Sequence, residues 1–580
     1  MASKKDLLLK TAAALKNALD EIDRNGPSLA QDNLAHSYVT EIDLCIVGEA
    51  RTQSYSVSYK KLEGLVKAYT KVEGRSAAAR KERGSIFDSI SKLLTEIVLN
   101  NALASAIPEG AQQVSKTPKT SSRTGQKEQI NEASIRHNFD ENLSTLLNVS
   151  MLKPKYPNIY ILGCFERKKT LLTQQQRAML LATGILKYWG RDHPPRVAIV
   201  GGGVAGTTAM CTLLKGGAEV RLFERSSQLM KLQRKSELRY LHPHLYDWPI
   251  SGSDRNLSNL PFLNWSAGYG KDVIETLDLE IASILKDTGA EAPITNYAVQ
   301  DIEPDQNGKY TISSDDLGPV TDFDVVILAI GFGVEHRPEF PAPVPSYWEN
   351  HPIHRLGVFD AANKGQLLIS GCGDGALVDV LRGAFEDFEH SKILSLVPEL
   401  HDGKLQEELL NIERLAKGAM MPTDSDSFLF SKHYDELLDG IQLSDEVLAK
   451  LAPHYQVTFN STRIGKFKLG TSVLNRVLVH LMISNGIVTF RKGKILNIET
   501  RIDKDSGRRI FQVDWGSKSG EFDDVIVRYG VDSKKHFKRQ FPELFKAGEQ
   551  NFDSYARAAF SSDIPVDLGD ILERQRRIWA

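Results

Sequence analysis

The stretch "RVAIVGGGVAGTTAMCTLLKGGAEVRLFER", residues 196–225, decides the fold. "RVAIV" is a short β-branched run typical of a strand buried on both faces, and "TTAMCTLL" continues as a helix. Between them Gly201, Gly203 and Gly206 stand in a G-x-G-x-x-G frame. The first glycine permits a tight turn, the second lets the backbone approach a pyrophosphate, and the third lets the helix pack on the strand. The pattern predicts a dinucleotide-binding turn.

The residues beside this turn support the same interpretation. Val204 and Ala205 open the helix, whose N-terminal N–H groups and dipole attract phosphates. A second strand, "AEVRLFE", ends on Glu224, and Arg225 follows it. A carboxylate at that place accepts hydrogen bonds from ribose hydroxyls and repels a 2′-phosphate.

The stretch 294–333, "ITNYAVQDIEPDQNGKYTISSDDLGPVTDFDVVILAIGFG", predicts a small β-meander and then a strand that ends on Gly331. At this point the chain resembles the flavoproteins of the glutathione reductase and thioredoxin reductase superfamily. Their FAD domain combines the glycine turn, the terminal Glu, a meander and a strand ending in A-x-G, a place that Ala329 and Gly331 fill here. The resemblance covers roughly 196–385 and implies FAD at the first site.

A second glycine cluster stands at 365–385, "GQLLISGCGDGALVDVLRGAF". It has two functional interpretations, beside the alternative that it is only a packing turn. Gly371, Gly373 and Asp374 resemble the G-x-G-D-x-A that opens the nicotinamide domain of thioredoxin-reductase-like proteins, with "FDDVIVRYG" (522–530) as its closing strand. Alternatively they form a late FAD motif, in which Asp374 accepts hydrogen bonds near the ribityl chain or the pyrophosphate. We favour the second interpretation slightly, which leaves NAD(P)H open as a further cofactor.

The cysteines separate this chain from the disulfide reductases that it resembles. Those enzymes need a redox-active cysteine pair, whereas Cys45, Cys164, Cys211 and Cys372 are widely spaced. We therefore exclude disulfide reduction, and this cysteine usage indicates a reducing compartment. The glycine pair and arginine that often follow the ribose-binding Glu in amine oxidases are also missing.

The segment 235–249, "KSELRYLHPHLYDWP", supplies the candidate catalytic residues. We expect it near the cofactor, since the chain leaving the second strand commonly runs back toward the pyrophosphate. Arg239 is a candidate phosphate ligand. His242 or His244 is a candidate proton exchanger near neutral pH, and Tyr246 can stack on the substrate or the flavin. The alternative is a structural loop whose aromatic side chains are buried and hydrogen-bonded. No third ligand accompanies the two histidines, so we expect no metal site.

The residue pattern and local composition divide the chain into five regions. We expect an α/β protein with a Rossmann-type FAD-binding domain at 196–390. A lead-in strand and helix at 133–195 precede it, and a mixed α+β domain at 391–580 follows it. Residues 1–107 read as a helical module that mediates oligomers or partner contacts, and 108–132 read as a linker.

In the lead-in region, the run 173–189, "TQQQRAMLLATGILKYW", predicts a helix. Gln175 and Arg177 near its start are within reach of a cofactor, although a solvated first turn is favoured.

The overall composition limits the classes of binding partner that we expect. A net charge of −2 gives no reason to expect nucleic acid as the main partner. No apolar run is long enough to span a bilayer, and the N-terminal stretch lacks a signal-peptide pattern. We therefore expect a cytoplasmic protein with no membrane partner and a small-molecule substrate.

These inferences converge on an FAD-dependent oxidoreductase that transfers a hydride between the flavin and a small molecule, with NAD(P)H as an open choice of donor. The alternative is a non-catalytic dinucleotide-binding sensor or assembly protein, because a fold does not guarantee its usual chemistry. Its helical N-terminus would then form a homo-oligomer or bind a protein partner.

Overall fold

The computed structural model describes the chain from Leu143 onward with short gaps. The described residues are 90, 140, 143–152, 155–166, 170–189, 192–333, 335, 340, 345–351, 353, 359, 363–418, 430–452, 454–462, 466–504, 507–516, 518–550, 552, 555 and 564–579. The helical module expected at 1–107 and the linker expected at 108–132 lie outside these residues, apart from Ile90.

The first sheet contains four parallel strands in the order β1-β9-β2-β3. They are β1 (Ile159–Ile161), β2 (Arg196–Val200), β3 (Glu219–Phe223) and β9 (Val325–Leu328). The apolar residues of β1, β2 and β9 are almost completely buried, as expected for parallel strands covered on both faces. The predicted strand at 196–200 is thus confirmed as an inner strand of this sheet.

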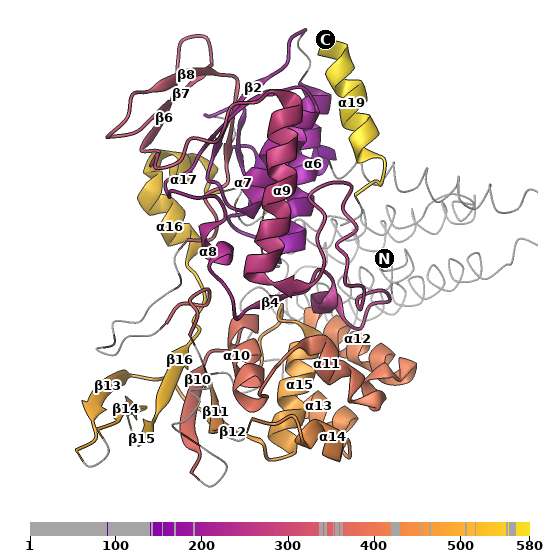
Figure 1. Ribbon diagram of the computed structural model, residues 1–580, viewed down its shortest axis with the longest axis vertical. Helices are drawn as coiled ribbons and strands as arrows, with labels where there is room; N and C mark the ends of the chain where they lie inside the picture. The colour runs from indigo at the N-terminus through magenta and orange to yellow at the C-terminus, as the bar shows by residue number, and fades with distance from the viewer. Residues whose placement is uncertain are drawn as a thin grey trace, which may run out of the picture. The chain divides into compact units, whose positions relative to one another are not determined.

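Three long helices accompany this sheet: α6 (Leu171–Tyr188), α7 (Val204–Lys215) and α9 (Gly270–Thr288). Helix α6 begins at a capping box in which Thr170 and Thr173 exchange side-chain and backbone hydrogen bonds. It packs along α7, and both are apolar where they meet (Figure 1). The strand and the helix expected in the lead-in region are therefore β1, which pairs with β9 in the first sheet, and α6, which packs on α7.

The expected meander is an antiparallel three-stranded sheet of β6 (Asp301–Pro304), β7 (Tyr310–Ser313) and β8 (Val320–Phe323). Its first turn contains Gly308 in a left-handed conformation with φ of 76°. Shorter elements lie between β3 and α9. They are α8 (Lys231–Arg234), β4 (Tyr240–Leu241), η2 (Leu245–Asp247) and β5 (Gly268–Tyr269).

A second parallel sheet has the order β12-β11-β10-β16. Its strands are β10 (Gly365–Ser370), β11 (Tyr455–Ser461), β12 (Val488–Lys492) and β16 (Asp524–Val527). Helices α10 (Asp374–Ala384) and α15 (Val473–Ser484) cover one face. Further helices join this region: α11 (His390–Ser395), η3 (Pro398–His401), α12 (Gly403–Gly418), α13 (Phe430–Leu438) and α14 (Asp445–Leu448).

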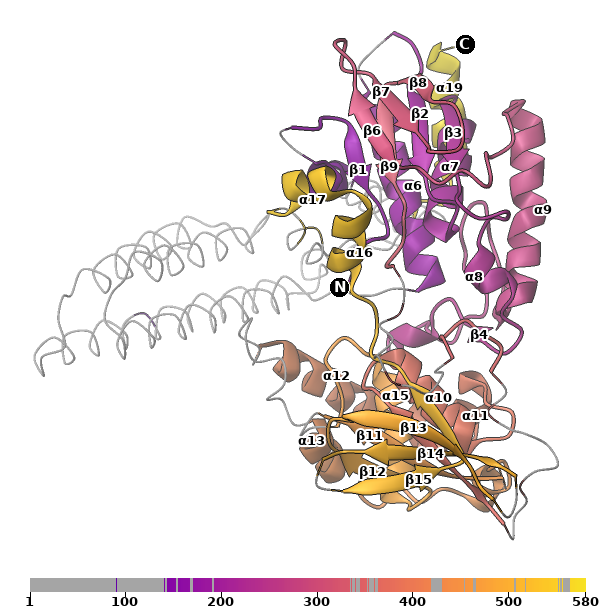
Figure 2. The ribbon, with the colours of Figure 1, turned by 90° about the vertical axis from the view of Figure 1, so that its left-hand side faces the viewer.

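The other face of the second sheet carries a second meander of β13 (Asn497–Ile502), β14 (Arg509–Asp514) and β15 (Ser519–Phe522), visible across the sheet in Figure 2. Successive side chains of β10 point to opposite faces of the sheet, so this strand contacts both the helices and the meander. Leu367 and Ile369 pack against the helices, whereas Leu368 packs against the meander. Strand β14 pairs with β13 and β15. Strand β16 lies within the stretch 522–530, which the nicotinamide interpretation predicts as a closing strand, and it joins β10.

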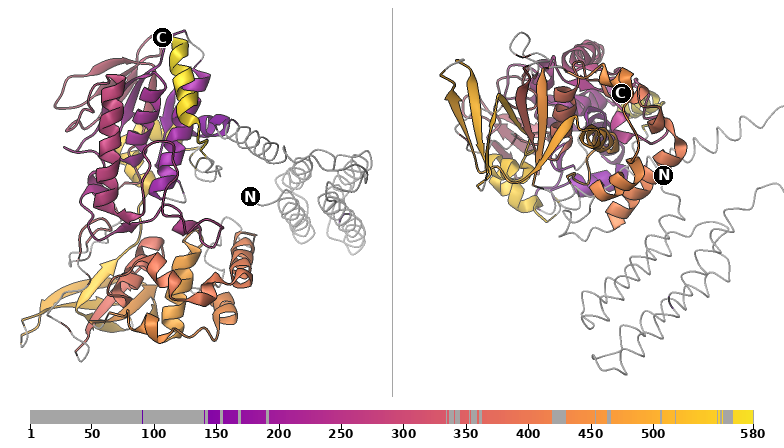
Figure 3. Two further views of the ribbon diagram at one scale, coloured as in Figure 1. Left: turned by 45° about the vertical axis from the view of Figure 1, so that its right-hand side comes forward. Right: turned by 90° about the horizontal axis from the view of Figure 1, so that it is seen from below.

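The chain returns to the first sheet after β16. Helices α16 (Ser533–Gln540), α17 (Pro542–Gly548) and α19 (Leu568–Trp579) bury apolar residues in the first core, and α19 lies beside α6 and α7 (Figure 3). We call residues 143–333 and 533–579 the first lobe, and residues 359–530 the second lobe. This division differs from the expected boundary near 390, because β10 and α10 belong to the second sheet.

Within the described residues, no helix combines the length and apolarity needed to cross a membrane.

Candidate functional site

The first glycine turn joins β2 to α7 and has two positions that only glycine fits. Gly201 has φ of 111°, and a side chain on it would overlap the carbonyl oxygen of Ala329. A side chain on Gly206 would overlap the carbonyl oxygen of Gly201. Strand β9, helix α7 and the turn therefore approach one another as closely as backbones can. The tight turn that the sequence predicts is present in the structure.

Gly203 differs from its two neighbours in the motif. Its φ of −76° is open to any residue, and a Cβ added to it would meet no atom within 4 Å. The helix N-terminus at Val204 and Ala205 has no side-chain cap from Gly203, so its first N–H groups face this open side. This is the geometry that lets a pyrophosphate approach the backbone.

Glu224 directly follows β3 and is tied to the turn. Its carboxylate accepts hydrogen bonds from the backbone N–H of Gly202 at 2.7 Å and of Ser226 at 2.7 Å. Oε1 also accepts a hydrogen bond from the Ser226 hydroxyl, whereas Oε2 retains a lone pair with which it can accept a hydrogen bond from a ribose hydroxyl. Arg225, the next residue, is exposed.

The end of β9 completes the first turn. The N–H of Ala329 donates to Val200 O at 2.8 Å, and Gly331 adopts a left-handed φ of 73°. The strand therefore ends against the glycine turn, as the A-x-G resemblance implies.

The second glycine turn repeats this geometry in the second lobe. Gly371 has φ of 141°, and a side chain on it would overlap the carbonyl oxygen of Arg528. A Cβ on Gly373 would again meet nothing within 4 Å. Each lobe thus has a glycine turn of the same geometry, and the second turn belongs to a separate parallel sheet. This arrangement favours the nicotinamide interpretation over the FAD interpretation that the sequence slightly favoured.

Asp374 begins α10 and is fully engaged with α15. Its Oδ1 accepts hydrogen bonds from the N–H of Ser472 at 2.8 Å and from Nδ2 of Asn475 at 2.7 Å. Its structural role is therefore to hold the N-terminus of α15 beside that of α10. Two helix N-termini, both with positive dipole ends, converge at this turn.

The loop proposed for catalysis is anchored by His242. Nδ1 of His242 accepts from the N–H of His244 at 3.2 Å and of Leu245 at 3.0 Å, which assigns the ring proton to Nε2 beside Asn256. Burial lowers the pKa of His242 to about 4, although the hydrogen bond to Asn256 opposes this. The imidazole is therefore neutral near pH 7 and serves as a backbone anchor. Nε2 of His244 lies 3.0 Å from Leu257 O.

Tyr246 and its neighbours pack against the second lobe. Leu245 and Trp248 belong to the second core, although they precede β9 in the sequence. Burial raises the pKa of Tyr246 well above its usual value, and Tyr347 and Asp374 add to the effect. The loop thus lies near the second glycine turn, whereas the sequence analysis placed it beside the flavin.

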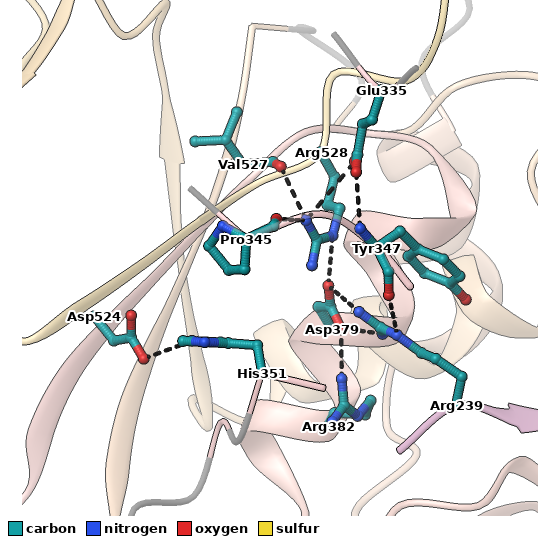
Figure 4. A network of polar contacts seen from close by, with 10 residues as sticks. All are labelled: Arg239, Glu335, Pro345, Tyr347, His351, Asp379, Arg382, Asp524, Val527 and Arg528. Atoms are coloured by element: carbon teal, nitrogen blue, oxygen red, sulfur yellow. Dashed lines mark hydrogen bonds and ion pairs between the residues drawn. The ribbon is translucent and has the colours of Figure 1, made fainter. Parts of the chain in front are cut away.

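A network of buried charges surrounds Asp379 on α10 (Figure 4). Its carboxylate accepts hydrogen bonds from Arg239, from Nε of Arg528 at 2.8 Å and from Nη1 of Arg382 at 3.0 Å. Burial alone would raise the pKa of Asp379, but the arginines outweigh it and hold the pKa below its usual range. Arg239 is therefore a partner of Asp379, and its predicted role as a phosphate ligand finds no support in these contacts.

Tyr347 and Glu335 extend this network between the lobes. The guanidinium of Arg239 lies 4.0 Å from the centroid of the Tyr347 ring and donates to Tyr347 O at 2.7 Å. Glu335 accepts from the N–H of Tyr347 at 2.8 Å. Burial raises the pKa of Glu335, while Arg528 opposes the rise. One signal for this network is readable in the sequence, because "VRYG" (527–530) occupies the place in the second lobe that "LAIG" (328–331) occupies in the first.

Sequence reasoning missed Gln174 near the start of α6. Both of its side-chain amide atoms are buried without a hydrogen-bond partner. Its Oε1 and the Cβ of Ala205 both lie close to the point where a side chain on Gly163 would stand, at 2.7 and 3.2 Å. Gln174 therefore lies beside the first glycine turn with unused donors and an unused acceptor.

Its neighbour Gln175, which the sequence analysis singled out instead, is fully engaged. It donates to Leu263 O at 2.9 Å and accepts from Trp265 Nε1 at 2.7 Å. Arg177 lies 4.0 Å from the buried carboxylate of Glu166.

Comparison with solved structures finds flavoproteins among the proteins that this chain resembles. A thioredoxin reductase from Lactococcus lactis is 13% identical over 58% of this chain and 78% of its own, with a TM-score of 0.27. A bacillithiol disulfide reductase from Staphylococcus aureus is 11% identical over 58% and 77%, with a TM-score of 0.28. An oxidised steroid monooxygenase bound to NADP is 12% identical over 58% and 72%, with a TM-score of 0.33.

No protein-family model and no curated protein sequence matches the chain. We therefore base the assignment of cofactors on the chain's own geometry.

Proposed function

We propose that this protein is an FAD-dependent oxidoreductase in which NAD(P)H bound by the second lobe supplies electrons to FAD bound by the first. The observation that carries the proposal is the repeated turn. Gly201 and Gly371 make the same close approach to a closing strand, and Gly203 and Gly373 have the same open side. One lobe of this kind binds one dinucleotide, so two lobes account for a cofactor and a second nucleotide.

The residues of the first lobe fit FAD. The open side of Gly203 faces the N-terminus of α7, where a pyrophosphate is favoured. Glu224 offers acceptors to ribose hydroxyls. The amide of Gln174 has no partner in the protein and lies beside the first glycine turn, where it offers donors and an acceptor to a bound cofactor. Bound there, FAD would supply hydride chemistry between NAD(P)H and a small-molecule acceptor.

The protein residues hold and orient these groups. Asp374 keeps the N-termini of α10 and α15 together at the second turn. The buried ion pair between Arg239 and Asp379 links the two lobes, and Arg528 binds the same carboxylate within the second lobe. Cys164, Cys211 and Cys372, the cysteines among the described residues, form no disulfide with one another, and we propose no disulfide substrate.

The test uses the full-length purified protein. It should be yellow, release FAD on denaturation, and bleach when NADH or NADPH is added under anaerobic conditions. A protein that binds no FAD and cannot be reconstituted with it would overturn the proposal.

One observation favours the non-catalytic alternative. His242 and Tyr246, two of the three proposed catalytic residues, serve structural roles in a buried loop. In a sensor or assembly protein, FAD would be bound but would resist reduction by both nicotinamide nucleotides. The anaerobic reduction therefore discriminates between the two functions.

A further inference from the structure

The two lobes can be aligned on one hydrogen bond. The N–H of Gly201 donates to Phe223 O at 2.8 Å, and the N–H of Gly371 donates to Asn460 O at 3.0 Å. The residues that directly follow these carbonyls are therefore structural equivalents. Glu224 of the first lobe corresponds to Ser461 of the second.

The two equivalent positions differ in charge, because Glu224 is acidic and Ser461 is not, and in each lobe this position lies where we expect the adenosine ribose. A carboxylate at this position binds the 2′-hydroxyl and repels a 2′-phosphate. Ser461 is uncharged and offers a hydroxyl that can donate or accept. The side chain of Asn460 cannot replace the missing acid, because it is bound to Ser370 Oγ at 2.7 Å, Arg491 O at 2.9 Å and Gly493 O at 3.0 Å.

The charged residues in the stretch of sequence around Ser461 are all basic. No Asp or Glu stands between Glu446 and Glu499, whereas eight basic residues do. They are Lys450, Arg463, Lys466, Lys468, Arg476, Arg491, Lys492 and Lys494. Arg476 is buried and paired with Glu413, and Lys450 precedes β11, so neither acts at the end of this strand. The cations that follow β11 and end β12 favour an anionic ligand.

Several of these cations lie where β11 and β12 end. Asn460 is in register with Arg491, and Ser461 is in register with Lys492. The N–H of Gly493 donates to Ser461 O at 3.1 Å, which brings the start of the 493–496 loop beside Ser461. The guanidinium of Arg491 is held by stacking 3.5 Å from the centroid of the Trp515 ring. Lys466, in the loop after β11, lies 5.7 Å from the Phe490 ring centroid.

We propose that the second lobe selects a dinucleotide with a 2′-phosphate on its adenosine ribose, so that the donor is NADPH and NADH is discriminated against. Ser461 replaces the repelling carboxylate, and Lys466 and Lys492 supply the positive field. The inference rests on the proposed function, because it specifies which nucleotide the second lobe binds.

The experiment measures binding of nucleotides to the full-length protein by isothermal titration calorimetry. The probes are NADP⁺, NAD⁺, 2′,5′-ADP and 5′-ADP, which separate the 2′-phosphate from the nicotinamide. We expect NADP⁺ to bind at least about tenfold more tightly than NAD⁺, and 2′,5′-ADP to exceed 5′-ADP similarly. The preference should shrink as salt is raised, because it is electrostatic.

Two variants and one control locate the effect. Ser461→Glu restores the first-lobe arrangement and should abolish or reverse the preference. Lys492→Ala, at an exposed position, should weaken NADP⁺ binding about threefold to tenfold while NAD⁺ binding stays unchanged. Lys450→Ala removes an exposed lysine before β11, at the opposite end of the strand, and should alter neither affinity.

The outcomes separate the two proposals. Tighter binding of NAD⁺ than of NADP⁺, or equal binding, would overturn the inference and leave the oxidoreductase function standing. A protein that contains FAD but binds none of the four probes would overturn both. If Ser461→Glu does not fold, Lys492→Ala still decides, because an unchanged ratio of the two affinities would contradict the inference.

Discussion

Arg239 and Asp379 form a two-bond ion pair across 140 residues of sequence, and both side chains are almost completely buried. The pair links the two lobes. The carbonyl of Arg239 accepts from the N–H of Gly270 at the start of α9, whereas Asp379 lies on α10. Arg382 and Arg528 also bond to Asp379, and Glu335 lies 3.7 Å from Arg528 as a second anion of the network. Asp379 is therefore the carboxylate at which the buried contacts between the lobes converge.

Asp379→Asn should strongly destabilise the protein. The substitution keeps the volume of the side chain but leaves buried guanidinium groups without their counter-charge, and breaking a buried ion pair costs about 3–5 kcal/mol. Denaturant unfolding measures the loss. The matched control is Glu521→Gln, whose pair with Arg501 is half exposed on both sides and should contribute less than about 1 kcal/mol. Equal effects of the two substitutions would contradict this role of Asp379.

The sequence predicted the first glycine turn well because its geometry is local. Gly201 and Gly206 are required by contacts within a strand, a turn and a helix, and such contacts leave a readable pattern. The pairing of Arg239 with Asp379 could not be predicted from the sequence in the same way. Arg239 has the same side chain whether it binds a phosphate or a carboxylate, and only the packing of α10 decides between them.

The ambiguity at Gly371 has a different physical origin. A strand, a glycine turn and a helix look alike wherever they occur, and the sheet to which β10 belongs is set by long-range pairing with β11 and β16. The same holds for β1, which precedes the glycine turn in sequence but pairs with β9. Local patterns predict elements, whereas strand order depends on contacts between distant segments.

His390 should make stability fall at mildly acidic pH. Its Nε2 lies 2.7 Å from Asn475 Oδ1 in the second core, and burial lowers its pKa to about 4. An unfolded histidine binds its proton near pH 6.5. Between these values the unfolded state holds more protons, so lowering the pH from about 6.5 to 4 should cost about 3 kcal/mol at this residue.

His390→Gln tests this pH dependence. Glutamine can still bond to Asn475 but does not titrate, so the curve of unfolding free energy against pH should be flatter for the variant than for the native protein. The measurement is denaturant unfolding at several pH values between 4 and 7.5. Parallel curves would show that His390 titrates with the same pKa in both states.

Gln174 and Gln175 should respond oppositely to replacement by leucine. Gln175→Leu leaves Trp265 Nε1 and Leu263 O unpaired in the core, and each unsatisfied buried group costs about 1–3 kcal/mol. Gln174→Leu removes an amide that has no partner in the protein, so the FAD-free protein should lose little stability. Its affinity for FAD should nevertheless fall about tenfold, because we assign its amide to the cofactor.

Unfolding of FAD-free protein and fluorescence titration with FAD measure the two effects separately. Native affinity for FAD in Gln174→Leu would remove Gln174 from the site. A stable Gln175→Leu would show that its two hydrogen bonds contribute less than their burial indicates.

Gly203 and Gly373 are the second glycines of the two G-x-G turns. Substituting them distinguishes nucleotide binding by the first lobe from nucleotide binding by the second lobe. Both have backbone angles open to valine, and a Cβ on either meets no atom within 4 Å. Neither Gly203→Val nor Gly373→Val should therefore disturb the fold. A side chain there would instead fill the volume in which we place a pyrophosphate. Gly203→Val should abolish FAD binding, whereas Gly373→Val should retain FAD but lose binding of the nicotinamide nucleotide and, with it, anaerobic bleaching.

Absorbance of the purified variants and calorimetry with NADP⁺ read out the two sites independently, and circular dichroism confirms that both variants fold. Gly373→Val decides between the two interpretations of the second turn. If that turn belonged to the FAD site, this substitution would also release FAD, and the two variants would be colourless alike. A yellow Gly373→Val protein that dithionite still bleaches but NADPH does not would place the nucleotide in the second lobe, because the flavin would be intact and only its electron donor would be lost.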